Sequence, residues 1–215
     1  MTTILLTALE ASGDVLGAGL MIELRRRLGP GVRFIGVGGP AMTGQGLVSA
    51  FDIAELSVFG LLDGVLAIRR AQRRADQIAD LARREAADIA VMIDSWGFSY
   101  LLARRLRKAI PGLGLVKYVA PQAWASRPGR AKALARSFDR LLSIVAFEVP
   151  LFEAAGIPTT FVGHPALGDD VLRGDGVAFR ARLGAGAAAS VVRGGDRPAE
   201  GCSAIAACGG GAGAA

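Results

Sequence analysis

The sequence predicts an α/β protein with a doubly wound parallel sheet, a Rossmann-like fold. Short apolar segments alternate along the chain with longer amphipathic ones, the pattern of strand–helix–strand units. The apolar segments are mostly continuous, as in parallel strands that are buried on both faces. The expected strands are residues 4–8, 33–37, 89–93, 115–119, 141–145 and 160–162.

Amphipathic segments between these strands are the expected helices. They are residues 14–28, 68–85, 100–109, 129–137 and 149–155. Ser12 and Asp14 are both candidate caps for the first helix, which ends before Gly29-Pro30. We therefore expect helices on both faces of the sheet.

Composition limits the classes of partner. The chain has 215 residues, 52% of them hydrophobic, which is enough for one α/β domain with a core. A formal net charge of +6 favours an anionic partner, which is nucleic acid, a phosphorylated substrate or an anionic membrane. Aromatic residues are few and none interleave with a basic stretch, so nucleic acid is not expected.

The cysteines, the single histidine and the lengths of the apolar runs limit the expected cellular compartment and the kinds of metal site. Cys202 and Cys208 lie near the C-terminus, so we expect no disulfide framework in the rest, as in a reducing compartment. His164 is the single histidine, which excludes a histidine-based metal cluster. With no signal peptide and no apolar run of about 18 residues, we expect a protein that is cytosolic or peripheral to a membrane.

The C-terminal end differs in composition from the rest of the chain. Residues 1–184 are expected to form one domain, whereas residues 185–215 are mostly Ala and Gly without periodicity. Such a segment buries too little apolar surface to offset its ordering entropy, so we expect disorder there. A natural linker and an out-of-frame reading of a GC-rich gene both explain it, and we favour the second.

Polar residues and glycines follow nearly every expected strand. Ligands bind beyond the carboxyl ends of the strands in open parallel sheets, so these residues should share one edge. We predict catalytic roles for Asp94 and Glu10. The predicted substrate-binding residues are Ser12, Gly13, Gly38, Gly39, Gln122, Trp124, Glu148 and His164.

Each of these residues also has a purely structural interpretation. Ser12 and Gly13 form a helix N-terminus that suits a phosphate, but ordinary capping explains them equally. Asp94 follows four apolar residues and is partly withdrawn from water, which makes it a better base, or else it caps the next helix. Trp124 could pack in the core, and His164 could hydrogen-bond within a tight turn.

An apolar stretch with glycines, residues 58–66, precedes an arginine cluster on the expected helix 68–85. This combination is typical of an interfacial membrane anchor. A core helix followed by a solvated basic face explains it equally. The residues predicted to contact membrane or phosphate are Leu61, Leu62, Leu66, Arg69, Arg70 and Arg73.

Seven short motifs occur in one order along residues 3 to 170. They are Glu10-Ala11-Ser12-Gly13-Asp14 and residues 36–42, 55–60, 93–94, 118–125, 147–148 and 161–165. Their order and spacing resemble those of the lipid-A-disaccharide synthase family, glycosyltransferase family 19. The resemblance places Asp94 on an aspartate important for activity, and Glu10 and Ser12 in the N-terminal loop motif.

The resemblance implies the acceptor-binding half of a two-domain GT-B glycosyltransferase. Such enzymes transfer 2,3-diacylglucosamine, with inversion, from its UDP donor to the 6-hydroxyl of 2,3-diacylglucosamine 1-phosphate (lipid X). The products are UDP and the β-1,6 disaccharide 1-phosphate of lipid A biosynthesis. The resemblance also implies action at the inner face of the cytoplasmic membrane of a Gram-negative bacterium, without a cofactor or bound metal.

This chain departs from the family pattern at three places. Trp96-Gly97 stands where a second aspartate is common, and Leu9 stands where glycine is usual. The Ala/Gly-rich sequence begins where a UDP-sugar-binding domain is expected, so the fragment itself should be inactive. Two other functions stay open, a nucleotide-dependent oxidoreductase that lacks the glycine fingerprint and a non-catalytic module that binds acidic lipid.

Overall fold

The computed structural model describes residues 2–57, 64–123, 129–164, 175–182, 184, 190–193 and 205–208. The chain divides into two compact units, Met1–Pro165 and Ala166–Ala215. The first unit contains the sheet that the sequence predicts.

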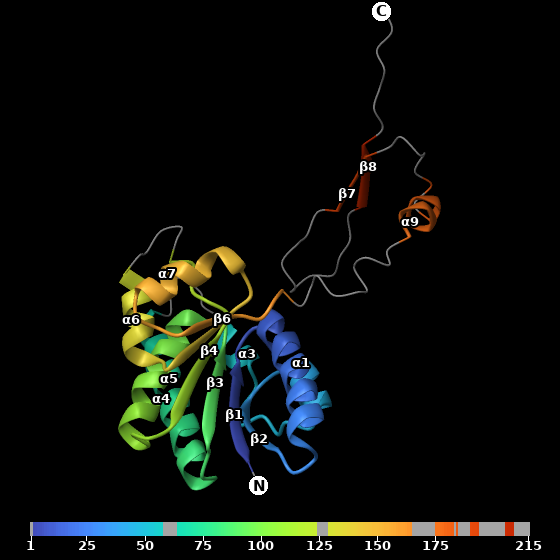
Figure 1. Cartoon of the computed structure of the whole chain (residues 1–215). Helices are drawn as coiled ribbons and strands as arrows, with labels where there is room; N and C mark the ends of the chain where they lie inside the picture. Colours follow the sequence, from blue (N-terminus) through green and yellow to red (C-terminus); the bar gives the residue numbers. More distant parts are fainter. Residues whose placement is uncertain are drawn as a thin grey trace, which may run out of the picture. The chain divides into compact units, whose positions relative to one another are not determined.

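That sheet has six parallel strands in the order β2-β1-β3-β4-β5-β6 (Figure 1). All the predicted strands are present, and their ends differ from the predicted ones by at most two residues. The strands are β1 Thr3–Ala8, β2 Arg33–Val37, β3 Ile89–Ile93, β4 Gly114–Tyr118, β5 Arg140–Ser143 and β6 Thr159–Phe161. The predicted fold class is thereby confirmed.

Helices connect these strands on both faces. They are α1 Ala11–Leu28, α2 Pro40–Gly44, α3 Ala54–Ser57, α4 Gly64–Arg84, α5 Trp96–Ala109, α6 Gly129–Ser137 and α7 Val149–Ala154, with a 3-10 turn η1 at Ala146–Glu148. The short elements α2, α3 and η1 were not predicted, because they hold too few residues to show a helical period. The predicted starts of α1, α4 and α5 were three or four residues late.

The start of α1 corrects one structural interpretation. Glu10 is the N-cap residue, and no side chain makes a capping hydrogen bond there. Ser12 and Asp14 lie inside the first turn, so neither of them caps α1 as the sequence had allowed.

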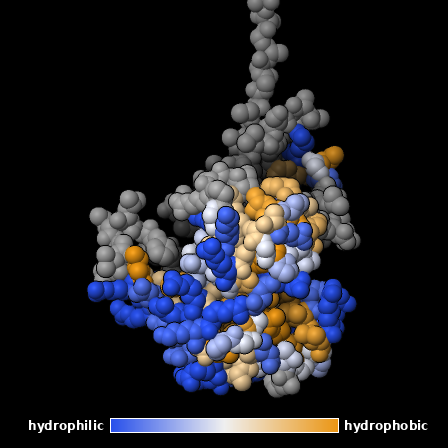
Figure 2. Space-filling model, turned by 60° about the vertical axis from the view of Figure 1, so that its left-hand side comes forward, coloured by the Kyte–Doolittle hydropathy of each residue, from blue (hydrophilic) through white to orange (hydrophobic). Residues whose placement is uncertain are grey.

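Two apolar clusters lie on opposite faces of the sheet. Leu5 of β1 packs in the cluster that includes buried residues of α4, α5, α6 and α7. Leu6, its neighbour in the strand, packs in the cluster that includes residues of α1 and α2. Figure 2 shows one face of the molecule, on which hydrophilic side chains lie beside hydrophobic patches.

The second unit contains regular structure that the sequence did not predict. Helix α9 spans Gly176–Arg182, and the strands β7 (Ser190–Arg193) and β8 (Ile205–Cys208) pair antiparallel. Both strands are too short for an alternation of apolar and polar residues to be recognised in an Ala/Gly-rich sequence. The composition of residues 185–215 gives no indication of this pairing.

One glycine permits the pairing of β1 with β2. Gly36 has φ +130°, and a Cβ atom there would lie 1.9 Å from the main-chain oxygen of Leu6. We expect Gly36→Ala to lower the free energy of unfolding by about 4 kcal/mol or more, because backbone must move to admit the methyl group. Urea unfolding followed by circular dichroism measures this. Gly112→Ala is the control, since no heavy atom lies within 4 Å of its added Cβ; equal midpoints for the two variants would contradict the prediction.

Candidate active site

The strand order creates a crevice between two neighbouring strands. From β1 the chain crosses to β2 at the sheet edge, and β3 then pairs on the opposite side of β1. The connection from β1 leads toward one edge of the sheet and the connection from β3 toward the other, so the strand order reverses between β1 and β3. Doubly wound sheets bind ligands at such a switch point. Glu10 follows β1 and Asp94 follows β3, so both carboxylates lie at this switch point.

Asp94 and Ser95 form a left-handed turn at the end of β3. Their φ angles are 51° and 41°, which costs non-glycine residues roughly 1–2 kcal/mol each. Surrounding contacts hold the turn: the amide of Asp94 donates to the carbonyl of Tyr118 (3.0 Å), and the Ser99 hydroxyl donates to the carbonyl of Asp94 (2.8 Å). The Ser95 hydroxyl donates to the Glu10 carboxylate (2.8 Å). The two predicted catalytic residues are therefore linked through Ser95.

The structural alternative for Asp94 is not observed. Ser95, and not Asp94, is the N-cap residue of α5, and no side-chain capping hydrogen bond is made there. Gly13 also approaches this turn, since a Cβ at Gly13 would lie 3.7 Å from the Cβ of Asp94. Ser12 is exposed next to it. The first turn of α1 thus lies beside Asp94, as the predicted site requires.

The glycines after β2 are explained by a buried carboxylate. Asp14 is 3% exposed and accepts hydrogen bonds from the amides of Gly39 (2.8 Å), Ala41 (2.8 Å) and Met42 (3.0 Å). Gly38 and Gly39 are buried, and a Cβ at Gly39 would lie 2.7 Å from Asp14. Asp14 therefore holds the start of α2 against α1. The predicted substrate contacts of these two glycines stay predictions.

A buried lysine lies beneath the turn, and the sequence reasoning missed it. Lys117 of β4 is 1% exposed, and its Nζ donates to the carbonyls of Met92, Asp94 and Tyr118. Burial lowers the pKa of Lys117 from 10.5 to about 7, while the nearby charges of Asp94 and Glu10 act to raise it. A lysine inside an otherwise apolar strand was the signal in the sequence.

The remaining rim residues follow β4, β5 and β6. Gln122 is exposed, and Trp124 lies outside the described residues. Glu148 is 5% exposed and accepts a hydrogen bond from the Ser143 hydroxyl (3.1 Å). His164 is exposed just after β6. Since β5 and β6 are separated from β3 by β4, Glu148 and His164 lie along the same edge but away from the switch point.

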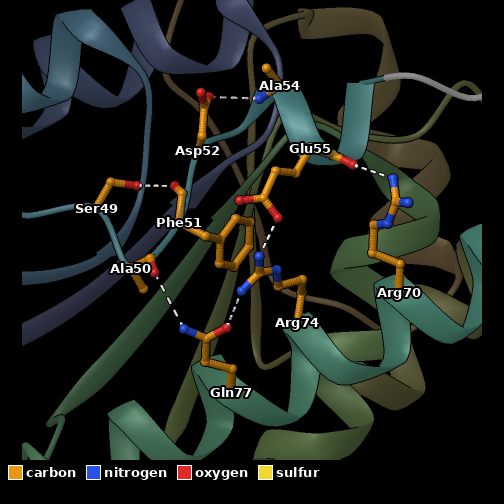
Figure 3. Close-up of polar contacts among 9 residues, drawn as sticks. All are labelled: Ser49, Ala50, Phe51, Asp52, Ala54, Glu55, Arg70, Arg74 and Gln77. Carbon is orange, nitrogen blue, oxygen red and sulfur yellow. Dashed lines mark hydrogen bonds and ion pairs between the residues drawn. The ribbon is translucent and has the colours of Figure 1, made fainter.

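Part of the arginine cluster has a structural role (Figure 3). Arg74 forms an ion pair with Glu55, donates to Gln77 (2.7 Å) and lies 4.6 Å from the centre of the Phe51 ring. Arg70 donates to the carbonyl of Glu55 (3.3 Å). These contacts fix the segment that leads into α3 against α4.

Arg69 and Arg73 of α4 are exposed. Leu61 and Leu62 lie outside the described residues, and so does the side chain of Leu66. The predicted membrane patch is thus described only in its basic part, Arg69, Arg70 and Arg73. No helix among the described residues is long and apolar enough to cross a membrane.

A groove of about 570 Å³ lies between the first turns of α5 and α6. It is lined by Trp96, Gly97, Tyr100, Gly129, Arg130 and Ala133. Trp96, the first of these residues in the chain, comes two positions after Asp94. The lining of the groove includes the aromatic side chains of Trp96 and Tyr100 and the guanidinium group of Arg130. In the described part of the chain, no cluster of His, Cys, Asp or Glu side chains could hold a metal ion.

Comparison with known proteins identifies the family. The lipid-A-disaccharide synthetase family model matches residues 4–183. The chain belongs to the lipid-A-disaccharide synthase family. The lipid-A-disaccharide synthase of Rhodospirillum centenum is 43% identical over 189 residues, which are 88% of this chain and 47% of the relative. That of Paramagnetospirillum magneticum is 43% identical over 181 residues, 84% of this chain and 46% of the relative.

A third lipid-A-disaccharide synthase, from Nitrobacter hamburgensis, is 46% identical over 165 residues, 76% of this chain and 42% of the relative. The chain therefore spans about half the length of the curated relatives it matches. The family match covers the first unit and extends through α9.

The lowered pKa of Lys117 predicts how stability changes with pH. Between about pH 7 and 10.5 the unfolded chain binds a proton at this side chain that the folded chain has released. Stability should therefore rise with pH in this window, by about 2 kcal/mol from pH 7 to pH 9. Urea unfolding at both pH values, compared with Lys117→Met, isolates the contribution of this side chain.

The variant should lose most of the rise, because it has no proton to exchange. Lys108→Met removes an exposed lysine and should retain the rise. The same pH dependence in Lys117→Met and in the unmodified chain would show that Lys117 keeps an ordinary pKa in the folded state.

Proposed function

We propose that this chain supplies the acceptor-binding half of a lipid-A-disaccharide synthase. The observation that carries the proposal is that Ser95, the residue after Asp94, hydrogen-bonds Glu10 at the switch point of the sheet. The chain that forms this sheet belongs to the lipid-A-disaccharide synthase family. The proposed reaction transfers 2,3-diacylglucosamine from its UDP donor to the 6-hydroxyl of lipid X. UDP and a β-1,6-linked disaccharide 1-phosphate are the products.

Asp94 is proposed as the general base. A sugar hydroxyl is a poor nucleophile at neutral pH, and inversion needs its direct attack on the anomeric carbon of the donor. Asp94 takes the proton as the new bond forms and the bond to UDP breaks. Glu10, held by Ser95, orients the acceptor sugar or takes the role of base itself. The left-handed turn of Asp94 supports this assignment, since strained backbone collects at functional sites.

The basic surface is proposed to meet the membrane that holds a diacylated acceptor. Arg69 and Arg73 are exposed, whereas Arg70 and Arg74 are bonded to Glu55. Leu61, Leu62 and Leu66 supply the apolar part of the same proposal. We place the protein in the cytoplasm at the inner face of the cytoplasmic membrane, where phosphate groups of lipid and acceptor attract the arginines.

Asp94 can be tested in a two-domain chimaera. We propose to join residues 1–183 to the second half of the Rhodospirillum centenum relative, because the family match ends at residue 183. Removal of a general base typically lowers the rate about 10²–10⁴-fold, so Asp94→Asn should lower kcat by that factor with little change in KM for the acceptor. Release of UDP and formation of disaccharide measure the reaction.

Asp76→Asn is the matched control, because Asp76 lies on α4 and pairs with Arg105 (2.6 Å). If Asp94→Asn keeps near-normal kcat while Glu10→Gln loses it, the two roles are reversed. Residues 1–215 alone should form no disaccharide, because donor and acceptor must be held in line for transfer. A chimaera that binds acidic lipid but transfers nothing would favour the non-catalytic binding module.

Membrane contact can be tested with vesicles. The 215-residue chain should bind vesicles that contain anionic phospholipid, and added salt should weaken binding because exposed charges are screened within about 10 Å at 0.1 M. The double variant Arg69→Gln, Arg73→Gln should weaken binding by about 30-fold, since each charge contributes about 1 kcal/mol. Sedimentation with vesicles measures the bound fraction.

Arg83→Gln with Arg84→Gln removes the same charge from the last turn of α4 and is the matched control. Leu61, Leu62 and Leu66 changed together to Ser should also release the chain while it stays folded. If this triple variant unfolds instead, these leucines belong to the core. Equal loss of binding in both arginine variants would show an effect of net charge alone.

A further inference from the structure

Lys117 is buried where a charged side chain is costly. Its Nζ lies on the side of β4 that faces β3, and its acceptors are main-chain carbonyls of Met92 (3.3 Å), Asp94 and Tyr118 (3.3 Å). Three N–H groups of an ammonium match three carbonyl acceptors. The side chain is therefore fully bonded, but it has given up all contact with water.

Two of the three carbonyls have a hydrogen-bond donor besides this lysine. The Asp94 carbonyl also accepts the Ser99 hydroxyl (2.8 Å), and the Tyr118 carbonyl also accepts the amide of Asp94 (3.0 Å). An apolar side chain of similar length would fill the same space without loss of hydration. Burial of the charged amino group thus opposes folding, so stability alone does not account for a lysine at this position.

The contacts of Lys117 point to what it serves. Its Nζ bonds the carbonyl of Asp94 from below, while Ser99 bonds the same carbonyl from α5. These bonds fix the peptide group between Asp94 and Ser95, which are the two residues in the left-handed turn. The charges of Asp94 and Glu10 both act on the amino group, so it lies within electrostatic reach of both carboxylates.

We propose that Lys117 is a positioning residue for the carboxylates of the site. Its amino group holds the carbonyl of Asp94, and this keeps the turn that aims Asp94 and places Ser95 to bind Glu10. The proposal deepens the proposed function, on which the roles of Asp94 and Glu10 rest. In this role Lys117 acts through Asp94 and Ser95, and it needs no direct contact with the substrate.

Hydrogen exchange in the 215-residue chain tests the positioning without any substrate. In Lys117→Met the amides of Asp94 and Ser99 should exchange about ten-fold faster or more. The first donates to the carbonyl of Tyr118 and the second to that of Ser95, so both bonds hold the turn in place. The amides of β1 should exchange at the unmodified rate, and the midpoint of urea unfolding at pH 7 should be unchanged or higher. Lys108→Met should alter none of these.

A second measurement needs no variant of Lys117. Nuclear magnetic resonance of the labelled lysine side chain follows its titration in the unmodified chain and in Asp94→Asn. The carboxylate of Asp94 raises the pKa of Lys117, so its removal should shift that titration to lower pH. A lysine beyond the electrostatic reach of Asp94 would not respond to this change.

Two results would overturn the proposal. One is a uniform rise in exchange across β1, β3 and β4 with a lower unfolding midpoint in Lys117→Met, which would make the lysine an ordinary structural residue. The other is a lysine titration that stays at the same pH in Asp94→Asn. If Lys117→Met does not fold, the titration decides. Neither measurement uses substrate. Both therefore test the positioning role of Lys117 even if the chimaera proves inactive.

Discussion

Parallel pairing of β1 with both β2 and β3 is the constraint on which the rest of the structure depends. All six residues of β1 are buried, and the strand lies between its two partners, second in the strand order β2-β1-β3-β4-β5-β6. The pairing requires close approach at Gly36, where any side chain would meet the backbone of β1. Because both neighbours run parallel to β1, their carboxyl ends meet at one edge. That alignment brings Glu10 and Asp94 together from positions far apart in the chain.

Strain and buried charge collect at this same edge. Asp94, Ser95 and Val119 all have positive φ, and Val119 is β-branched, so its left-handed backbone is especially unfavourable. Lys117 lies directly before the β4 end of this edge. The parallel sheet and its two apolar clusters supply the stability that offsets these costs. Elsewhere Asp14 holds the loop after β2 through three amides, so that side of the crevice is fixed by a carboxylate that does not reach solvent.

The arginines of α4 divide between two tasks. Arg74 packs over Phe51 and pairs with Glu55, which attaches the segment before α4 to the helix itself (Figure 3). Arg69 and Arg73 stay exposed. A single basic helix thus contributes both to the packing of the domain and to the positive surface that the net charge of +6 implies.

The sequence by itself determined the strands, the fold class and the shared edge of Glu10 and Asp94. Continuous apolar segments are a local signal of buried parallel strands, and the strand ends place the polar residues that follow them. The same reasoning failed at α2, α3 and the paired strands β7 and β8, which are too short for a period to show. From the sequence, Ser12 and Asp14 were candidate caps of α1. In the structure neither caps it, and Asp14 accepts hydrogen bonds from amides at the start of α2.

Only the tertiary structure decided which partners the polar side chains take. A lysine in an apolar strand gives the same sequence pattern whether its amine reaches solvent or is buried. The amine of Lys117 is buried and bonds carbonyls in and directly after the neighbouring strand β3. The bond from Ser95 to Glu10 joins residues 85 positions apart, and it exists because β1 and β3 pair in one register. Hydrophobic periodicity is a property of neighbours in the chain. Register, crossover and burial belong to the assembled sheet, and these set the contacts of the site.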